Sequence, residues 1–107
     1  MTGIFDTSVR SAEDYGGVFE LEDGTAYFYL YAMKAPHGQR VVAATELPLA
    51  AISPVEAADV EILWDDLEEY VAVFIKGVMK AAYEIATQRP YNACRSEIPD
   101  TIKQRFI

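Results

Sequence analysis

The chain of 107 residues is 51% hydrophobic and 24% charged, which predicts one globular domain with a single hydrophobic core. Nine basic residues oppose seventeen acidic ones, and residues 1–70 hold fourteen of the acidic residues but only three of the basic ones. Nucleic acids and anionic membranes bind clustered lysine and arginine, so this charge argues against both as partners and favours a basic protein.

The first predicted element is a β-hairpin around Asp23-Gly24, which separates the runs "GGVFELE" and "TAYFYLYAM". An Asp-Gly pair suits the positive φ values of a type I′ turn, and a two-residue turn places Glu22 opposite Thr25. One face of the hairpin then collects core residues: Phe19, Leu21, Ala26, Phe28 and Leu30. The other face is amphipathic and collects Glu20, Glu22, Tyr27, Tyr29 and Tyr31, with Val18 between them.

The segment after the hairpin contains a loop, one further strand and a helical signal. Pro36 and Gly38 interrupt regular structure in "KAPHGQ", and "RVVAATEL" from Arg40 predicts a third strand. The run Ser53-Pro54-Val55-Glu56 has the form of a capping box with proline at the first helical position. We therefore expect a short helical turn that begins at Ser53.

Residues 59–88 are compatible with two structures. As a helix, the apolar residues from Val71 to Ile85 recur at helical spacing. As strands, "DVEILW", "YVAVFI" and "VMKAAYEI" form a meander with turns at Asp65–Glu69 and Lys76-Gly77. The β-branched residues favour strands, and a glycine inside a helix would cost about 1 kcal/mol. The hydrophobic pattern alone leaves both structures open.

The C-terminal stretch "RPYNACRSEIPDTIKQRFI" contains Pro90 and Pro99, which predict a mostly irregular path. Proline suits the first position of a helix, so we expect a helical turn after Pro99. Together the elements predict one all-β or β-dominated domain over residues 1–107, with α+β as the alternative. We expect about five to seven antiparallel strands in meander order, in a single sheet that curls or forms a small sandwich.

Four stretches carry a resemblance to a known family: "VFELEDGTAYFY", "VEILW", "VAVFIKGVMKAAYEI" and "RPYNACRSEIP". They resemble a family of small bacterial proteins catalogued as a domain of unknown function, over most of residues 17–99. The resemblance implies a β-rich single domain and favours strands in residues 59–88, and it implies no activity. At Asp65-Asp66-Leu67-Glu68 the chain departs from the Ser-x-Asp-Gly turn of that family, so this loop is expected to differ in shape.

Groups typical of catalytic or metal sites are few. The acidic run at residues 65–69 lacks the order of an EF-hand loop, so a solvated turn that blunts a sheet edge is expected there. His37 is the only histidine and lies in a loop, without a nucleophile or an orienting partner in its pattern. Cys94 is the only cysteine; its neighbour Arg95 makes it a candidate reactive thiol, but a structural or incidental thiol is the more common case. We predict no catalytic residues, no metal and no cofactor.

The cellular location is predicted from what the chain lacks. Cys94 has no partner for an internal disulfide, and residues 1–20 lack the basic start and apolar run of a secretory signal peptide. No apolar segment approaches the roughly 18 residues that span a bilayer. These features predict a cytoplasmic protein.

Aromatic residues support two hypotheses about function. The first is a non-enzymatic interaction module, immunity-like or adaptor-like, that binds a basic protein or a second copy of itself as a homodimer. Its candidate binding residues are Glu20, Glu22, Tyr27, Tyr29 and Tyr31. The second is a small-molecule-binding domain or weak enzyme, with a pocket that joins Tyr27 and Tyr29 to Trp64, Tyr70 and Tyr83. Tyrosines occur in a core as well as on a surface, so the structure must show which face of the hairpin is covered before either hypothesis is preferred.

Overall fold

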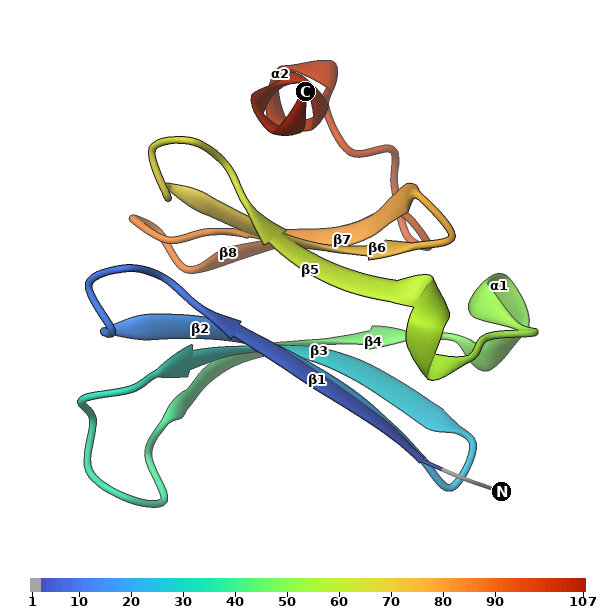
Figure 1. Ribbon diagram of the computed structural model, residues 1–107, viewed down its shortest axis with the longest axis horizontal. Helices are drawn as coiled ribbons and strands as arrows, with labels where there is room; N and C mark the ends of the chain where they lie inside the picture. The colour runs from blue at the N-terminus through green and yellow to red at the C-terminus, as the bar shows by residue number, and fades with distance from the viewer. Residues whose placement is uncertain (1–2) are drawn as a thin grey trace.

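Two four-stranded antiparallel sheets lie face to face in the computed structural model, which describes residues 3–107 (Figure 1). Sheet A runs in the order β1 (Ile4–Val9), β2 (Tyr15–Glu22), β3 (Thr25–Ala32) and β4 (Val41–Leu47). Sheet B runs in the order β5 (Val60–Trp64), β6 (Tyr70–Ile75), β7 (Val78–Glu84) and β8 (Arg89–Asn92). The predicted β-dominated meander is confirmed in its sandwich form, with eight strands rather than five to seven.

Both predicted tight hairpins are present. Asp23 and Gly24 have φ values of 52° and 78°, and Glu22 faces Thr25 as the two-residue turn requires. Lys76 and Gly77 make the same kind of turn between β6 and β7, with φ values of 53° and 81°. Within residues 59–88 the structure therefore has the three strands β5, β6 and β7 and no long helix, because the turn chemistry and the β-branched residues both favour strands.

The edge strands and one helical turn differ from the predictions. β1 was not predicted, and β8 lies in the tail that was expected to be irregular, with Pro90 allowed because an edge strand can spare a donor. The helical turn expected from Ser53 is also wrong. Ser53 ends α1 (Leu49–Ile52) in extended backbone, as a residue before proline prefers, and the 3-10 turn η1 (Ala57–Asp59) begins after Glu56.

The core lies between the two sheets. Phe28 of β3 and Tyr83 of β7 are fully buried, with ring centroids 5.2 Å apart, and the Tyr83 hydroxyl donates a hydrogen bond to the Phe28 carbonyl. Burial raises the pKa of Tyr83, so this hydroxyl keeps its proton. β2 comes so close to sheet B that a Cβ atom on Gly17 would lie 2.8 Å from Cγ2 of Val71. The two sheets are thus in direct contact at their centres.

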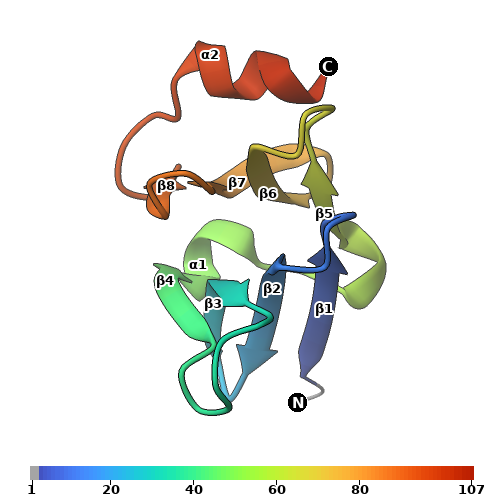
Figure 2. The same ribbon diagram turned by 90° about the vertical axis from the view of Figure 1, so that its left-hand side faces the viewer.

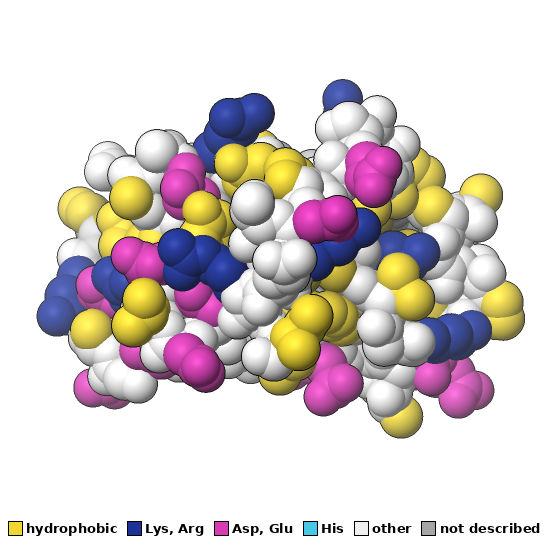
Figure 3. Space-filling view, turned by 90° about the horizontal axis from the view of Figure 1, so that it is seen from above, with side chains coloured by type: hydrophobic (Ala, Val, Ile, Leu, Met, Phe, Trp, Pro, Cys, Tyr) yellow, Lys and Arg dark blue, Asp and Glu magenta, His cyan; other side chains and the backbone are white. Residues whose placement is uncertain are grey.

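A C-terminal segment covers the outer face of sheet B. It comprises α2 (Asp100–Lys103) and the 3-10 turn η2 (Gln104–Phe106), and it lies over sheet B in both views (Figures 1 and 2). Ile98 and Ile102 are buried in a second apolar cluster with residues of β6 and β7, and the Phe106 ring meets Phe74 edge-on. Basic and acidic side chains are both scattered over this covered side (Figure 3).

Polar contacts join the sheets where β1 runs beside β5. The Trp64 indole donates to the Ser8 carbonyl at 3.3 Å, and Arg10 donates to the Glu68 carbonyl at 2.9 Å. Arg10 also forms a two-pronged ion pair with Asp14, at 2.6 and 2.8 Å. The hydrogen bond from Arg10 lowers the pKa of Asp14 to about 2. The turn between β1 and β2 is therefore fixed to the turn between β5 and β6.

Replacing Tyr83 with phenylalanine should lower the free energy of unfolding by about 1–2 kcal/mol, because the variant lacks the hydroxyl that donates a hydrogen bond to the opposite sheet. Urea unfolding followed through Trp64, the only tryptophan, measures the change. Tyr91→Phe is the matched control, since Tyr91 is half-buried and we expect a change below about 0.5 kcal/mol. Equal losses in the two variants would contradict the inter-sheet role of Tyr83.

Asp14→Asn should make the free energy of unfolding less dependent on pH in the acidic range. The carboxyl has its ordinary pKa of 3.8 in the unfolded chain and about 2 in the fold, so its ion pair stabilises the fold above about pH 4. That contribution is lost as pH falls towards 2. The variant should lose about 1 kcal/mol or less at pH 7 and show a flatter curve between about pH 4 and 2.

Urea unfolding at several pH values tests this expectation. Asp66→Asn is the control, because Asp66 is exposed and forms no ion pair among residues 3–107. An acid profile of Asp14→Asn that matches the unmodified chain would show that the Arg10 pair does not govern this region.

Candidate functional site

The candidate site is the outer face of sheet A, which we call the tyrosine face. It is built from three cross-strand rows, each with one residue from every strand of the sheet. The rows are Phe5, Glu20, Tyr27 and Glu46; Thr7, Val18, Tyr29 and Ala44; and Val9, Gly16, Tyr31 and Val41. β3 contributes all three tyrosines because alternate residues of a strand point to the same side.

The tyrosine rings form a continuous line along β3. Tyr27 and Tyr29 stack with centroids 5.6 Å apart, and Tyr31 meets Tyr29 edge-on at 6.4 Å. The Tyr29 hydroxyl lies 3.5 Å from Oε1 of Glu20. Burial, followed by the charge of Glu20, raises the pKa of Tyr29. The hydroxyl is therefore a donor that stays protonated at neutral pH.

The tyrosine face has an acidic end and an apolar end. In the first row Tyr27 lies directly between Glu20 and Glu46, and Glu22 follows at the hairpin turn. In the third row Tyr31 lies between Val9 and Val41, which are 41% and 48% exposed. No position in the three rows is lysine or arginine, and Arg40 lies beside Tyr31 and Val41, so the negative charge is concentrated at the acidic end.

No described helix or strand covers the tyrosine face. The C-terminal segment lies on the opposite side of the molecule, above sheet B (Figures 1 and 2). Phe5, in the acidic row, remains 66% exposed although it is a large apolar side chain. The face is therefore an aromatic and apolar surface open to solvent, of the kind that marks interaction sites.

The candidate pocket residues lie in three different places. Tyr83 is buried between the sheets, Trp64 lies half-buried at the edge of sheet B, and Tyr70 faces the C-terminal segment. Tyr27 and Tyr29 lie beyond sheet A from Tyr83, which bonds to the Phe28 carbonyl on the inner side. The structure does not bring these aromatic side chains together around one cavity.

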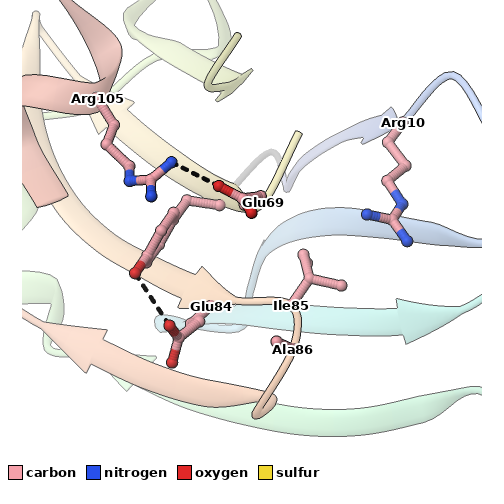
Figure 4. A pocket seen from close by; sticks show the side chains of 7 residues that line it. Arg10, Glu69, Glu84, Ile85, Ala86 and Arg105 are labelled. Carbon is pink, nitrogen blue, oxygen red and sulfur yellow. Dashed lines mark hydrogen bonds and ion pairs between the residues drawn. The ribbon is translucent and has the colours of Figure 1, made fainter. Parts of the chain in front are cut away.

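Tyr70 does line a small pocket of its own, of about 280 Å³, between Arg105 and Glu84 (Figure 4). Its hydroxyl donates to Glu84 at 3.0 Å, and the Arg105 guanidinium lies 4.7 Å from its ring centre. Arg105 also pairs with Asp65 at 2.9 Å and with Glu69 at 2.8 Å. Each charge in the pocket has a partner within the chain, so the pocket lacks an unpaired group to hold a ligand.

Asp65, at the start of the acidic run, is buried rather than solvated. Its Oδ1 accepts hydrogen bonds from the backbone of Glu69 and Tyr70, and its Oδ2 accepts one from Arg105. Asp65 therefore closes the turn between β5 and β6 and binds it to the C-terminal segment. This role explains a carboxylate at the end of a strand without invoking a metal.

The other candidate groups lie apart from one another. His37 lies in the exposed loop between β3 and β4, and Cys94 is exposed after β8. Within residues 3–107, no three histidine, cysteine or acidic side chains gather as a metal site requires. The short helices of the described chain are also not long and apolar enough to cross a membrane.

The strand register confirms that the tyrosines and Glu20 share one face of the hairpin, as the turn predicts, but the apolar side chains of the neighbouring strands were not predicted. Phe5 and Val9 belong to β1, which was not recognised, and Val41 lies beside a bulge between β3 and β4. The alternation of Phe5, Thr7 and Val9 in "IFDTSV" was the available signal. A strand of six residues is too short for that alternation to stand out.

The comparison with protein families agrees with this fold. A family described as "Uncharacterized protein conserved in bacteria (DUF2251)" matches residues 3–106. Neither the search of curated proteins nor the search of solved structures gives a match. The resemblance noted at the Asp-Gly hairpin and at the Trp64-ended strand is confirmed, and the chain belongs to the DUF2251 family of bacterial proteins.

Proposed function

We propose that this protein is a non-enzymatic interaction module that binds a basic protein partner through the tyrosine face. The observation that supports it is an open sheet face with three aligned tyrosines and an exposed Phe5. Aromatic side chains supply much of the energy of protein interfaces, because they bury large areas with little loss of conformational freedom.

Charge complementarity favours a basic partner. Glu20, Glu22 and Glu46 lie at the Tyr27 end of the exposed aromatic surface, and the chain as a whole carries a net charge of −8. A second copy would bring the same acidic groups to the interface, which costs energy when two like patches meet. A partner with lysine or arginine removes that cost and associates faster at low salt.

The first row offers a specific seat for one cationic side chain. Tyr27 lies between two carboxylates in register, so a guanidinium above its ring would meet Glu20 on one side and Glu46 on the other. A cation over an aromatic face gains about 0.5–2 kcal/mol, and each carboxylate adds a charged hydrogen bond. Tyr29, Tyr31 and Val41 then provide the apolar surface on which the partner packs.

The double variant Glu20→Gln/Glu46→Gln tests the proposal, because it removes both charges beside Tyr27 and keeps the side-chain shapes. The immobilised protein and variant are exposed to native bacterial lysate at low and high salt, and bound proteins are identified by mass. A basic protein should bind the unmodified chain, dissociate at high salt and bind the variant at least about tenfold more weakly.

The matched control is Glu61→Gln/Glu97→Gln, which removes two exposed carboxylates that lie outside the tyrosine face. This control should retain the partner, and Tyr29→Ala should release it without a change in net charge. A partner that binds all variants equally would overturn the proposal. A concentration-dependent dimer that Tyr29→Ala dissociates would also overturn it, since the face would then belong to a second copy.

A further inference from the structure

A second surface feature lies at the other edge of the sandwich, where β4 runs beside β8. A groove of about 490 Å³ opens there between the edges of the two sheets. Its sheet A wall carries Tyr27, Thr45 and Glu46, and the opposite wall carries Arg89, Tyr91 and the turn after β8. This volume lies within the range of about 300–1,000 Å³ that is usual for small-ligand sites.

Asn92 forms the floor of the groove and fixes its geometry. It is 6% exposed, and its Nδ2 donates to Thr45 Oγ1 at 2.8 Å and to the Glu46 carbonyl at 2.7 Å. Its Oδ1 accepts a hydrogen bond from the Cys94 amide, and its carbonyl accepts from the amides of Arg95 and Ser96. One buried side chain thus joins the sheets and positions the turn that carries Arg95 into the groove.

The groove collects donors that the chain leaves without acceptors. Arg10 and Arg105 both pair with carboxylates, whereas Arg89 and Arg95 form no ion pair within residues 3–107. Arg89 lies 5.0 Å from the ring centre of Tyr91. Thr45 accepts its hydrogen bond from Asn92, which leaves its own hydroxyl proton available.

The charge of the lining is positive in an otherwise acidic protein. Glu46 is the one carboxylate among the lining residues, and it is exposed, whereas two guanidiniums lie on the opposite wall. Arg89 lies opposite Glu84 in the strand register. A hydrogen bond from Thr87 lowers the pKa of Glu84 most, and the charge of Arg89 contributes, but neither arginine forms an ion pair within the described chain. Guanidinium groups bind phosphate and carboxylate through two parallel hydrogen bonds.

We propose that this groove binds a small ligand through an oxyanion, a phosphate or a carboxylate, held by Arg89 and Arg95. The hydroxyls of Ser96 and Thr45 complete the set of donors. Asn92 holds the site ready before the ligand arrives, which lowers the entropic cost of binding. The groove shares Tyr27 and Glu46 with the seat proposed for the basic partner, whereas Arg89, Arg95 and Ser96 belong to the groove alone.

Titration followed by amide chemical shifts tests the site, with inorganic phosphate, adenosine monophosphate and succinate as probes. We expect saturable shifts at Arg95 and Ser96, and at least about tenfold weaker binding by the double variant Arg89→Gln/Arg95→Gln. Tighter binding of the two phosphate probes would assign the site to phosphates, and tighter binding of succinate would assign it to carboxylates.

Lys34→Gln/Lys76→Gln is the matched control, because both lysines are exposed and lie in loops away from the groove. This variant loses the same charge and should bind each probe within about twofold of the unmodified chain. If both double variants bound the probes equally weakly, the loss would be explained by overall charge alone and the proposal would be overturned. The absence of saturable shifts up to about 10 mM of every probe would overturn it as well.

Discussion

The fold depends on direct contact between the inner faces of two small sheets. A chain of this length can build one core, and here that core is the layer in which Phe28 meets Tyr83. The tyrosine hydroxyl would be costly in that layer without a partner, and the bond to the Phe28 carbonyl meets this need. Because this bond is directional, it fixes how one sheet lies on the other, which nonspecific apolar contact alone does not.

The outer faces of the two sheets have different surroundings. Sheet B is buried on both sides, since Ile98 and Ile102 pack on its outer face. Sheet A keeps one side open, where solvent meets tyrosine, valine and glutamate. The groove lies between these two environments, at an edge where Asn92 replaces apolar packing with hydrogen bonds. Both surfaces for which binding is proposed thus lie where the chain does not complete its own packing.

The sequence predicted those parts that rest on local chemistry. Asp23-Gly24 and Lys76-Gly77 define their hairpins through turn conformation alone, so strand register and the facing of each tyrosine followed. β1 and β8 escaped prediction because they are short edge strands, one rich in polar residues and one with Pro90. The groove could not be predicted from the sequence either, since Thr45 and Asn92 form their hydrogen bond only in the folded chain.

The size of the residue at position 17 limits the size of the residue at position 71, although the two positions are far apart in the sequence. A methyl group at this site would collide with Val71, and both lie in a layer that cannot expand without loss of contact elsewhere. Volume gained at one position must therefore be given up at the other. Among relatives that keep this sandwich, alanine at position 17 should accompany a smaller residue at position 71, a covariation that records the distance between the sheets.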